Sequence, residues 1–216
     1  MKLTIKSKIQ FPLLNGTFAA MAALLLTGAP AALADTTWTS TSSTLFSTAA
    51  NWNNGTPTTG PQLGIFADNT GIQDTIDVAG TARVGLGFEF NAGTAANGFT
   101  LMSTFAGGGP GLFIRAGGTV NGMVNNDTAT ATINVPIKLT SNSGIAGAAA
   151  AMVFNAAGGN MILNGTNTSN SGALWTINLN GASNLTFTGS ANITVGSVGG
   201  GAIINTNTPN NGGLIK

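Results

Sequence analysis

Residues 82–90 read Ala-Arg-Val-Gly-Leu-Gly-Phe-Glu-Phe, and this stretch carries the pattern that decides the fold. Apolar side chains occupy every second position, and glycine or a charged residue fills each position between them. Because successive side chains of a β-strand point to opposite faces of a sheet, a period of two predicts a strand with one buried face and one wet face. We therefore expect a half-buried strand at residues 82–90.

The same alternation recurs along the chain, at residues 128–135, 175–180, 184–188 and 191–195. Turns rich in glycine and asparagine separate the segments, at 121–122, 158–160, 164–165, 180–181 and 199–201. These two residue types tolerate the positive backbone angles that tight turns need. Residues 144–157 are ambiguous, because the alanine run at 148–151 is compatible with a helical turn or with an irregular strand. The chain as a whole is predicted to be all-β.

Segments in the second half of the chain follow one another at a spacing of about ten residues. This spacing suits a β-solenoid with three short strands per coil, and it also suits a β-sandwich. The low charge and the abundance of Asn and Thr, which can stack in ladders from coil to coil, favour the solenoid. We therefore expect a right-handed parallel β-helix over residues 71–216, with a β-sandwich as the alternative. Residues 35–70 differ, because they combine irregular polar sequence with two tryptophans and two prolines. We expect them to form an N-terminal cap that protects the first coil from edge-to-edge aggregation.

The first 34 residues have the three parts of a secretory signal peptide. Lys2, Lys6 and Lys8 precede an apolar run at residues 18–26, and Ala-Leu-Ala at 32–34 is a signal-peptidase pattern. The apolar run is too short to span about 30 Å of hydrocarbon. We expect cleavage before Asp35, export of the mature chain, and no membrane span after cleavage.

Charge and composition exclude several classes of function. The chain has seven basic residues; losing three with the signal leaves four against six acids, a formal charge of −2. Without a basic patch, nucleic acids and anionic membranes are not expected partners. The chain contains no cysteine, so an exported form relies on packing and hydrogen bonds. It contains no histidine, which is the usual neutral-pH general base and the commonest metal ligand.

Two short motifs carry a family resemblance. Residues 50–57 read Ala-Asn-Trp-Asn-Asn-Gly-Thr-Pro, and residues 212–216 read Gly-Gly-Leu-Ile-Lys. They resemble exported bacterial surface proteins with autotransporter-associated β-strand repeats, in which N-W-x-x-G-x-P commonly follows the signal peptide and G-G-L-x-K opens the repeat. The resemblance implies a Gram-negative cell-surface or extracellular location. It also implies that the chain is the N-terminal portion of a longer passenger-like protein, with a short secreted relative as the alternative.

Acidic residues supply the few candidates for metal binding or catalysis. Asp68, Asp74 and Asp77 cluster near a turn and offer oxygen ligands of the kind that Ca²⁺ prefers, but their spacing fits no EF-hand loop. We expect a solvated turn there, and neither a metal nor a cofactor. Glu89 and Asp127 are the other acids that a glycosidase pair would use, and nothing in the sequence brings them together.

Tryptophans supply the candidates for glycan contact. Trp38 and Trp52 are able to stack on sugar rings, although packing within the cap is the favoured interpretation, and Trp175 lies on the apolar side of its strand. The leading hypothesis is therefore a non-catalytic, adhesin-like structural protein that contacts polysaccharide or a host or matrix surface. The alternative is a polysaccharide-active enzyme or carbohydrate-binding module on the same fold.

Overall fold

In the computed structural model the chain is built from short strands in parallel sheets, with almost no helix. The structure describes residues 34–57, 62–79, 82–84, 87–104, 111–116, 121–141, 151–165, 167–168, 174–179, 184–196, 202–204 and 213–215. Residues 1–33 of the predicted signal peptide and residues 148–150 of the alanine run lie outside these ranges. The all-β prediction is confirmed, and the only helix in the described residues is a single 3₁₀ turn, η1 (Ala49–Asn51).

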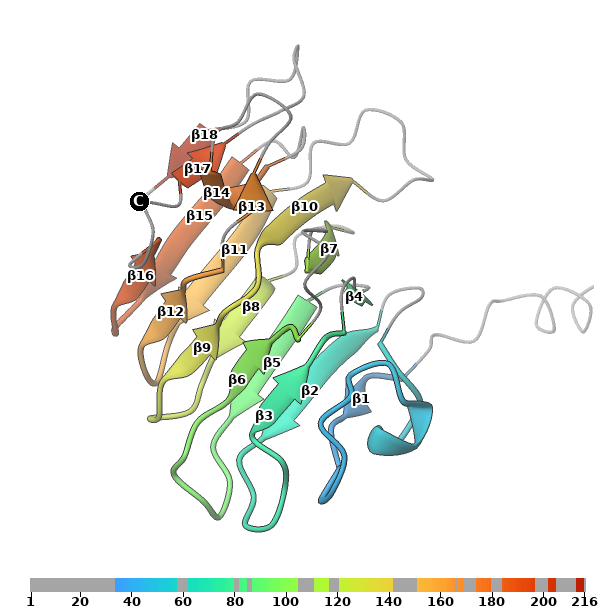
Figure 1. Cartoon of the computed structure of the whole chain (residues 1–216). Coiled ribbons are helices and arrows are strands. Elements are labelled where there is room, and N and C mark those ends of the chain that lie inside the picture. The colour runs from blue at the N-terminus through green and yellow to red at the C-terminus, as the bar shows by residue number, and fades with distance from the viewer. Residues whose placement is uncertain are drawn as a thin grey trace, which may run out of the picture. The chain divides into compact units, whose positions relative to one another are not determined.

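Three sheets contain the strands of the described residues (Figure 1). The seven-stranded sheet has the order β1 (Thr36–Thr37), β2 (Leu63–Ala67), β5 (Gly87–Asn91), β8 (Asn121–Asn125), β11 (Ala151–Ala156), β15 (Asn184–Gly189) and β18 (Gly213–Ile215). The five-stranded sheet has the order β16 (Ile193–Val195), β12 (Met161–Leu163), β9 (Ala131–Ile133), β6 (Thr100–Met102) and β3 (Thr75–Asp77).

The six-stranded sheet has the order β13 (Asn167–Thr168), β14 (Leu174–Asn178), β10 (Ile137–Ser141), β7 (Leu112–Ala116) and β4 (Ala82–Val84), with β17 (Ala202–Ile204) also paired to β14. From β2 onward the chain visits the seven-, five- and six-stranded sheets in that order and then begins again. All strand pairs in the described residues are parallel except β13 with β14.

The inward-facing side chains of the three sheets form one aliphatic and aromatic core. In the five-stranded sheet, Ile76, Leu101, Ile133 and Leu163 occupy neighbouring register positions and are fully buried. In the seven-stranded sheet, Phe66 pairs with Phe90 in register, and their rings stack at 5.3 Å. The period-two pattern therefore correctly assigned the inward face of two of these strands, with Ile133 on β9 and Phe90 on β5.

The prediction of one strand at residues 82–90 is wrong. Ala82–Val84 forms β4 in the six-stranded sheet, whereas Phe88 and Phe90 belong to β5 in the seven-stranded sheet. Gly87, at the start of β5, has a φ of 143°, a conformation that glycine adopts without strain. The alternation continues although the chain passes from one sheet to another between β4 and β5, so the period alone did not reveal the change.

Other strands depart from the sequence pattern at single positions. Asn121 and Gly122 were expected in a turn, but both lie within β8. Thr176 and Asn178 were expected on a wet face, but both are buried, as are Ile177 and Leu179 between and after them. Residues 144–157 contain the strand β11.

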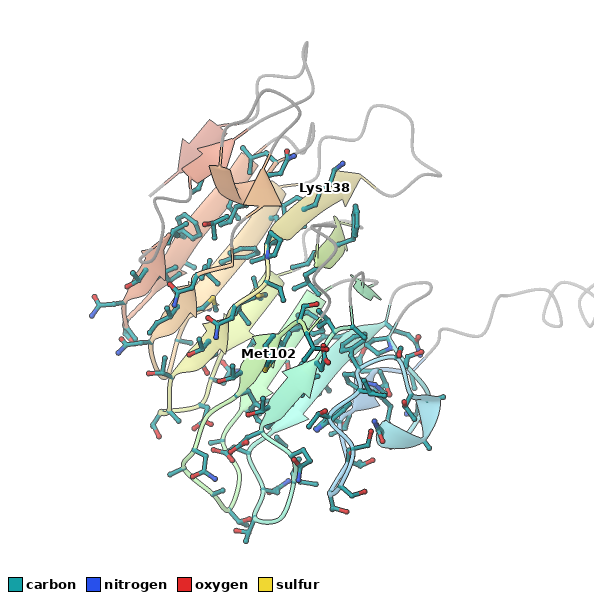
Figure 2. The ribbon with its side chains drawn as sticks, viewed as in Figure 1. Met102 and Lys138 are labelled. Atoms are coloured by element: carbon teal, nitrogen blue, oxygen red, sulfur yellow. The ribbon has the colours of Figure 1, made fainter. Side chains whose placement is uncertain are left out.

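Outer faces of the sheets carry few charges. Lys138 on β10 is half-buried, and its Nζ lies 5.7 Å from the ring centroid of Phe113 on the neighbouring strand β7, within cation–π range (Figure 2). No helix among the described residues is long and apolar enough to cross a membrane.

Candidate functional site

The aromatic cluster near the N-terminus contains both tryptophans proposed for glycan contact. Trp38 and Trp52 meet edge to face at 5.2 Å, and Trp52 also packs on Phe46 and Phe66. Only 1% of Trp38 and 4% of Trp52 is exposed. Their indole N–H groups donate to the carbonyl oxygens of Gln73 and Phe46, each at 2.9 Å.

Burial of both rings has a direct consequence for ligand binding. A sugar ring stacks on an aromatic face that solvent can reach, and here neighbouring side chains cover both faces. The arrangement therefore favours packing at the first strands over glycan contact by Trp38 and Trp52. The side chain of Trp175 lies outside the described residues, although its backbone pairs with β13 and β17.

The acidic cluster is not the solvated turn that the sequence indicated. Asp68 is 2% exposed, and its Oδ2 accepts hydrogen bonds from the backbone N–H groups of Asn97 and Gly98 at 2.8 and 3.0 Å. The turn after β2 thus holds the turn after β5. Asp74 is only partly exposed, and its carbonyl oxygen accepts from the N–H of Thr100.

Asp77 binds the chain in a similar way at the end of β3. Its carboxylate accepts hydrogen bonds from the backbone N–H groups of Ala79 and Thr104 and from the Thr104 hydroxyl. Burial raises the pKa of Asp77, but these three hydrogen bonds lower it by more, so the pKa lies below its usual 3.8. Sequence reasoning missed this role because two of the three donors belong to Thr104, 27 residues away.

In the described part of the chain, no three acidic side chains gather where they could bind a metal ion. The carboxylates of Asp68 and Asp77 are each directed at backbone donors of a neighbouring turn. Glu89 lies half-buried on β5, and its Oε2 accepts from Asn91, whereas Asp127 is buried in the turn after β8. Arg83 lies on β4, in a different sheet from Glu89.

A buried asparagine is the structural residue that the sequence did not single out. Asn125 ends β8 at a register position where β5 has Phe90, and it is fully buried. Its Nδ2 donates to the carbonyl oxygens of Ala129 and Asn160, each at 2.9 Å, and its Oδ1 accepts from the N–H of Asp127 at 3.2 Å. One side chain therefore fixes two successive turns.

A column of threonines crosses the outer face of the five-stranded sheet. Neighbouring strands place these residues in direct register, and side-chain alternation turns them away from the core: Thr75, Thr100, Thr132, Ile162 and Thr194. Thr75 and Thr194 are exposed, and the three residues between them are partly exposed. We call this set the threonine column.

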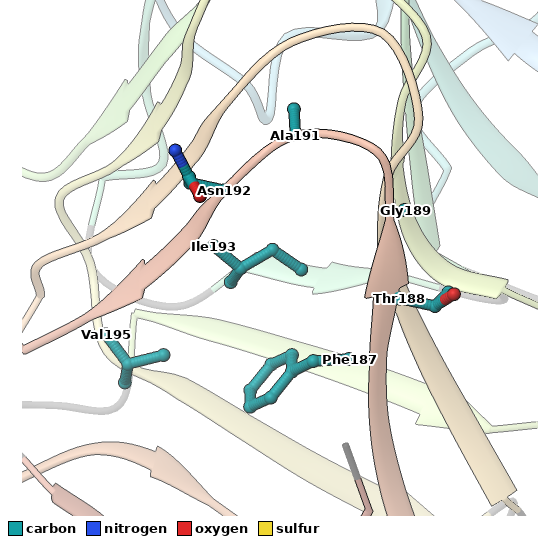
Figure 3. Close-up of a pocket in the computed structure, with 7 residues that line it drawn as sticks. All are labelled: Phe187, Thr188, Gly189, Ala191, Asn192, Ile193 and Val195. Atoms are coloured by element: carbon teal, nitrogen blue, oxygen red, sulfur yellow. The ribbon is translucent and has the colours of Figure 1, made fainter.

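A cavity of about 590 Å³ lies between β15 and β16. Figure 3 shows Phe187, Ile193 and Val195 facing the same space from these two strands. On earlier strands the corresponding side chains, such as Met161 and Leu163, are covered by the next strand of the sheet. β16 is last in the order of its sheet, so the cavity is the open end of the core in the described residues.

Comparison with known proteins identifies no relative of this chain. No protein family, curated protein or solved structure matches this chain. The resemblance to surface proteins with autotransporter-associated repeats therefore stays a prediction from the two short motifs.

Proposed function

We propose that this chain is an exported, non-catalytic structural protein of the cell surface or the extracellular space, built as a right-handed parallel β-solenoid with an N-terminal cap. The observation that carries the fold is the repeated order in which the chain visits three parallel sheets. Hydrogen-bonded turn residues in neighbouring repeats lie 24 to 35 residues apart, which is the length of one coil. Right-handed connection is the rule for parallel strands joined by a crossover.

Contacts at the first strands support a cap at residues 35–70. β1 pairs along the outer edge of β2, and the segment of Thr44 and Phe46 exchanges backbone hydrogen bonds with Asp77 on β3. The aromatic cluster closes the core beneath them. The outer edges of β2 and β3, which would otherwise be open to another chain, are thereby paired.

The hydrogen bond of the Asp35 side chain is consistent with a mature chain that begins at this residue. The Asp35 carboxylate accepts a hydrogen bond from the N–H of Leu63 at 3.0 Å, and the Ala34 carbonyl accepts from Gln62 at 3.1 Å. Residues 33–216 form a compact unit by themselves. The fold thus holds Asp35, the residue predicted to be the mature N-terminus.

The acidic side chains bind backbone groups of the fold, and this supports a non-catalytic role over the alternative of a polysaccharide-active enzyme. Asp68 and Asp77 are engaged by backbone donors, and Asp127 is buried in a turn. The proposed role is mechanical: parallel ladders provide stiffness, and the neutral outer faces contact a surface. The expected partners are a polysaccharide or a host or matrix surface.

Expression of the full chain in a Gram-negative host tests the proposal. We expect N-terminal sequencing of the exported protein to begin at Asp35, and a protease added to intact cells or to the medium to reach it. We also expect cells or beads coated with the protein to adhere to polysaccharide or matrix. Retention of residues 1–34 on a cytoplasmic protein would contradict export. Release of soluble sugars from a glycan panel would favour the enzymatic alternative.

A further inference from the structure

The threonine column presents hydroxyl groups that the fold itself does not use. In the described residues, no hydrogen bond involves the side chain of Thr75, Thr100, Thr132 or Thr194, whereas Thr36, Thr94 and Thr104 each donate to a neighbour. A threonine hydroxyl both donates and accepts. The column thus offers hydrogen bonds that only a ligand or water takes up.

Spacing and rigidity make the column a preorganised surface. Adjacent strands in a sheet lie about 4.8 Å apart, so five strands place the column over a length of about 19 Å. Threonine is β-branched and stiff about χ1, and the residues on the three inner strands are each held between two paired neighbours. Binding along the column therefore costs little side-chain entropy.

Charge restricts the class of partner. The strands of this sheet contain one charged residue, Asp77, and its carboxylate is buried against the backbone of Ala79 and Thr104. Nucleic acids and anionic lipids need cations that these strands lack. A protein interface needs large apolar anchors, and Ile162 and Met102 are the largest apolar side chains on the outer face, each only partly exposed.

We propose that the threonine column binds a linear, uncharged polysaccharide that lies across the strands of the five-stranded sheet and hydrogen-bonds to successive threonine hydroxyls. This inference rests on the proposed function, because it names the partner and the face of the surface protein. Each contact is weak, and affinity comes from their repetition along one rigid row.

The test is retention of the purified protein on insoluble polysaccharides, with microcrystalline cellulose and chitin as the neutral probes and heparin–agarose as the charged one. The test variant is Thr100→Val combined with Thr132→Val, which removes two central hydroxyls and keeps the β-branched shape. The matched control is Thr128→Val, at an exposed threonine in a turn outside the column. We expect the double variant to bind a neutral probe about tenfold more weakly, because two hydrogen bonds are lost. The control should bind like the wild type, and both variants should melt within a few degrees of it.

Three outcomes would overturn the inference. They are equal retention of the wild type and the double variant, retention on heparin–agarose alone, and no retention of the wild type on either neutral probe. None of these outcomes bears on cleavage before Asp35 or on exposure at the cell surface. N-terminal sequencing and the protease experiment therefore test the proposed function separately.

Discussion

Replacement of Asn125 by aspartate is the sharpest test of how successive turns are joined. The two side chains have nearly the same shape, so packing against Phe90 is unchanged while both hydrogen-bond donors disappear. The new carboxylate would face the carbonyl oxygens of Ala129 and Asn160 at the 2.9 Å now spanned by N–H donors. We expect Asn125→Asp to destabilise the protein strongly at neutral pH.

The size of the effect follows from the two lost bonds and the buried charge. Each lost bond costs about 1 kcal/mol, and leaving a buried charge without its partner costs about 3–5 kcal/mol. The chain avoids part of this cost by relaxing, which leaves a loss of about 4 kcal/mol in the free energy of unfolding at pH 7. For a folded unit of this size, that loss lowers Tm by about 8–16 °C.

The loss of stability caused by Asn125→Asp should depend on pH in a definite direction. Burial beside two carbonyl oxygens raises the pKa of the introduced carboxyl above its unfolded value of about 3.9. A raised folded-state pKa means that the penalty is absent below about pH 3.9 and grows as the pH rises towards the folded-state value. The neutral acid restores one donor, so the loss should shrink to about 1–2 kcal/mol near pH 4.

Urea unfolding at pH 4 and pH 7 measures both values against the wild type at the same pH. The matched control is Asn126→Asp, at the exposed neighbour whose side chain donates one hydrogen bond to Asn91. It should cost less than about 1 kcal/mol at either pH. Equal losses for the two variants, or a loss for Asn125→Asp that does not depend on pH, would refute the reasoning.

Four further predictions concern stability. Gly165→Ala places a Cβ 1.9 Å from the backbone carbonyl carbon of Val135, and it should lower the free energy of unfolding in urea by more than about 2 kcal/mol. Its control is Gly71→Ala, where the Cβ meets open space but φ is 86°, and it should lower the free energy of unfolding by about 1 kcal/mol. Trp52→Ala should cost about 3–5 kcal/mol by the same assay, and a smaller loss would contradict its place in the aromatic cluster. Because the pKa of Asp77 is lowered, Tm should be nearly constant from pH 4 to 9 and fall below pH 3.8, and Asp77→Asn should flatten that fall. Thr176→Val replaces a buried hydroxyl without a partner by a methyl group and should raise Tm by a few degrees; a lower Tm would show that the hydroxyl is satisfied.

Alternation in the sequence predicted several of the strands and their inward faces, because it reports burial directly. It correctly placed Ile133, Ile177 and Leu185 in the core. It failed between β4 and β5, because the chain passes from one sheet to another there while the alternation continues.

The polar residues with structural roles were beyond sequence reasoning for a different reason. Asp68 and Asp77 read as members of an ordinary polar turn, and Asn125 is one of many asparagines. Their partners lie one repeat away, and only the register brings them together. The threonine column is hidden for the same reason, because its members come from five separate strands.

The parallel pairing of each strand with the equivalent strands before and after it affects how the chain loses its structure. The strands of each sheet pair only with the adjacent strands in its order, so no described ladder joins β2 directly to β15. Stability then behaves as a one-dimensional sum over adjacent repeats, and melting is expected to begin at an end and travel inward. β1 and the aromatic cluster add contacts at the first strands, so unravelling of the described strands is not expected to start at β2 and β3.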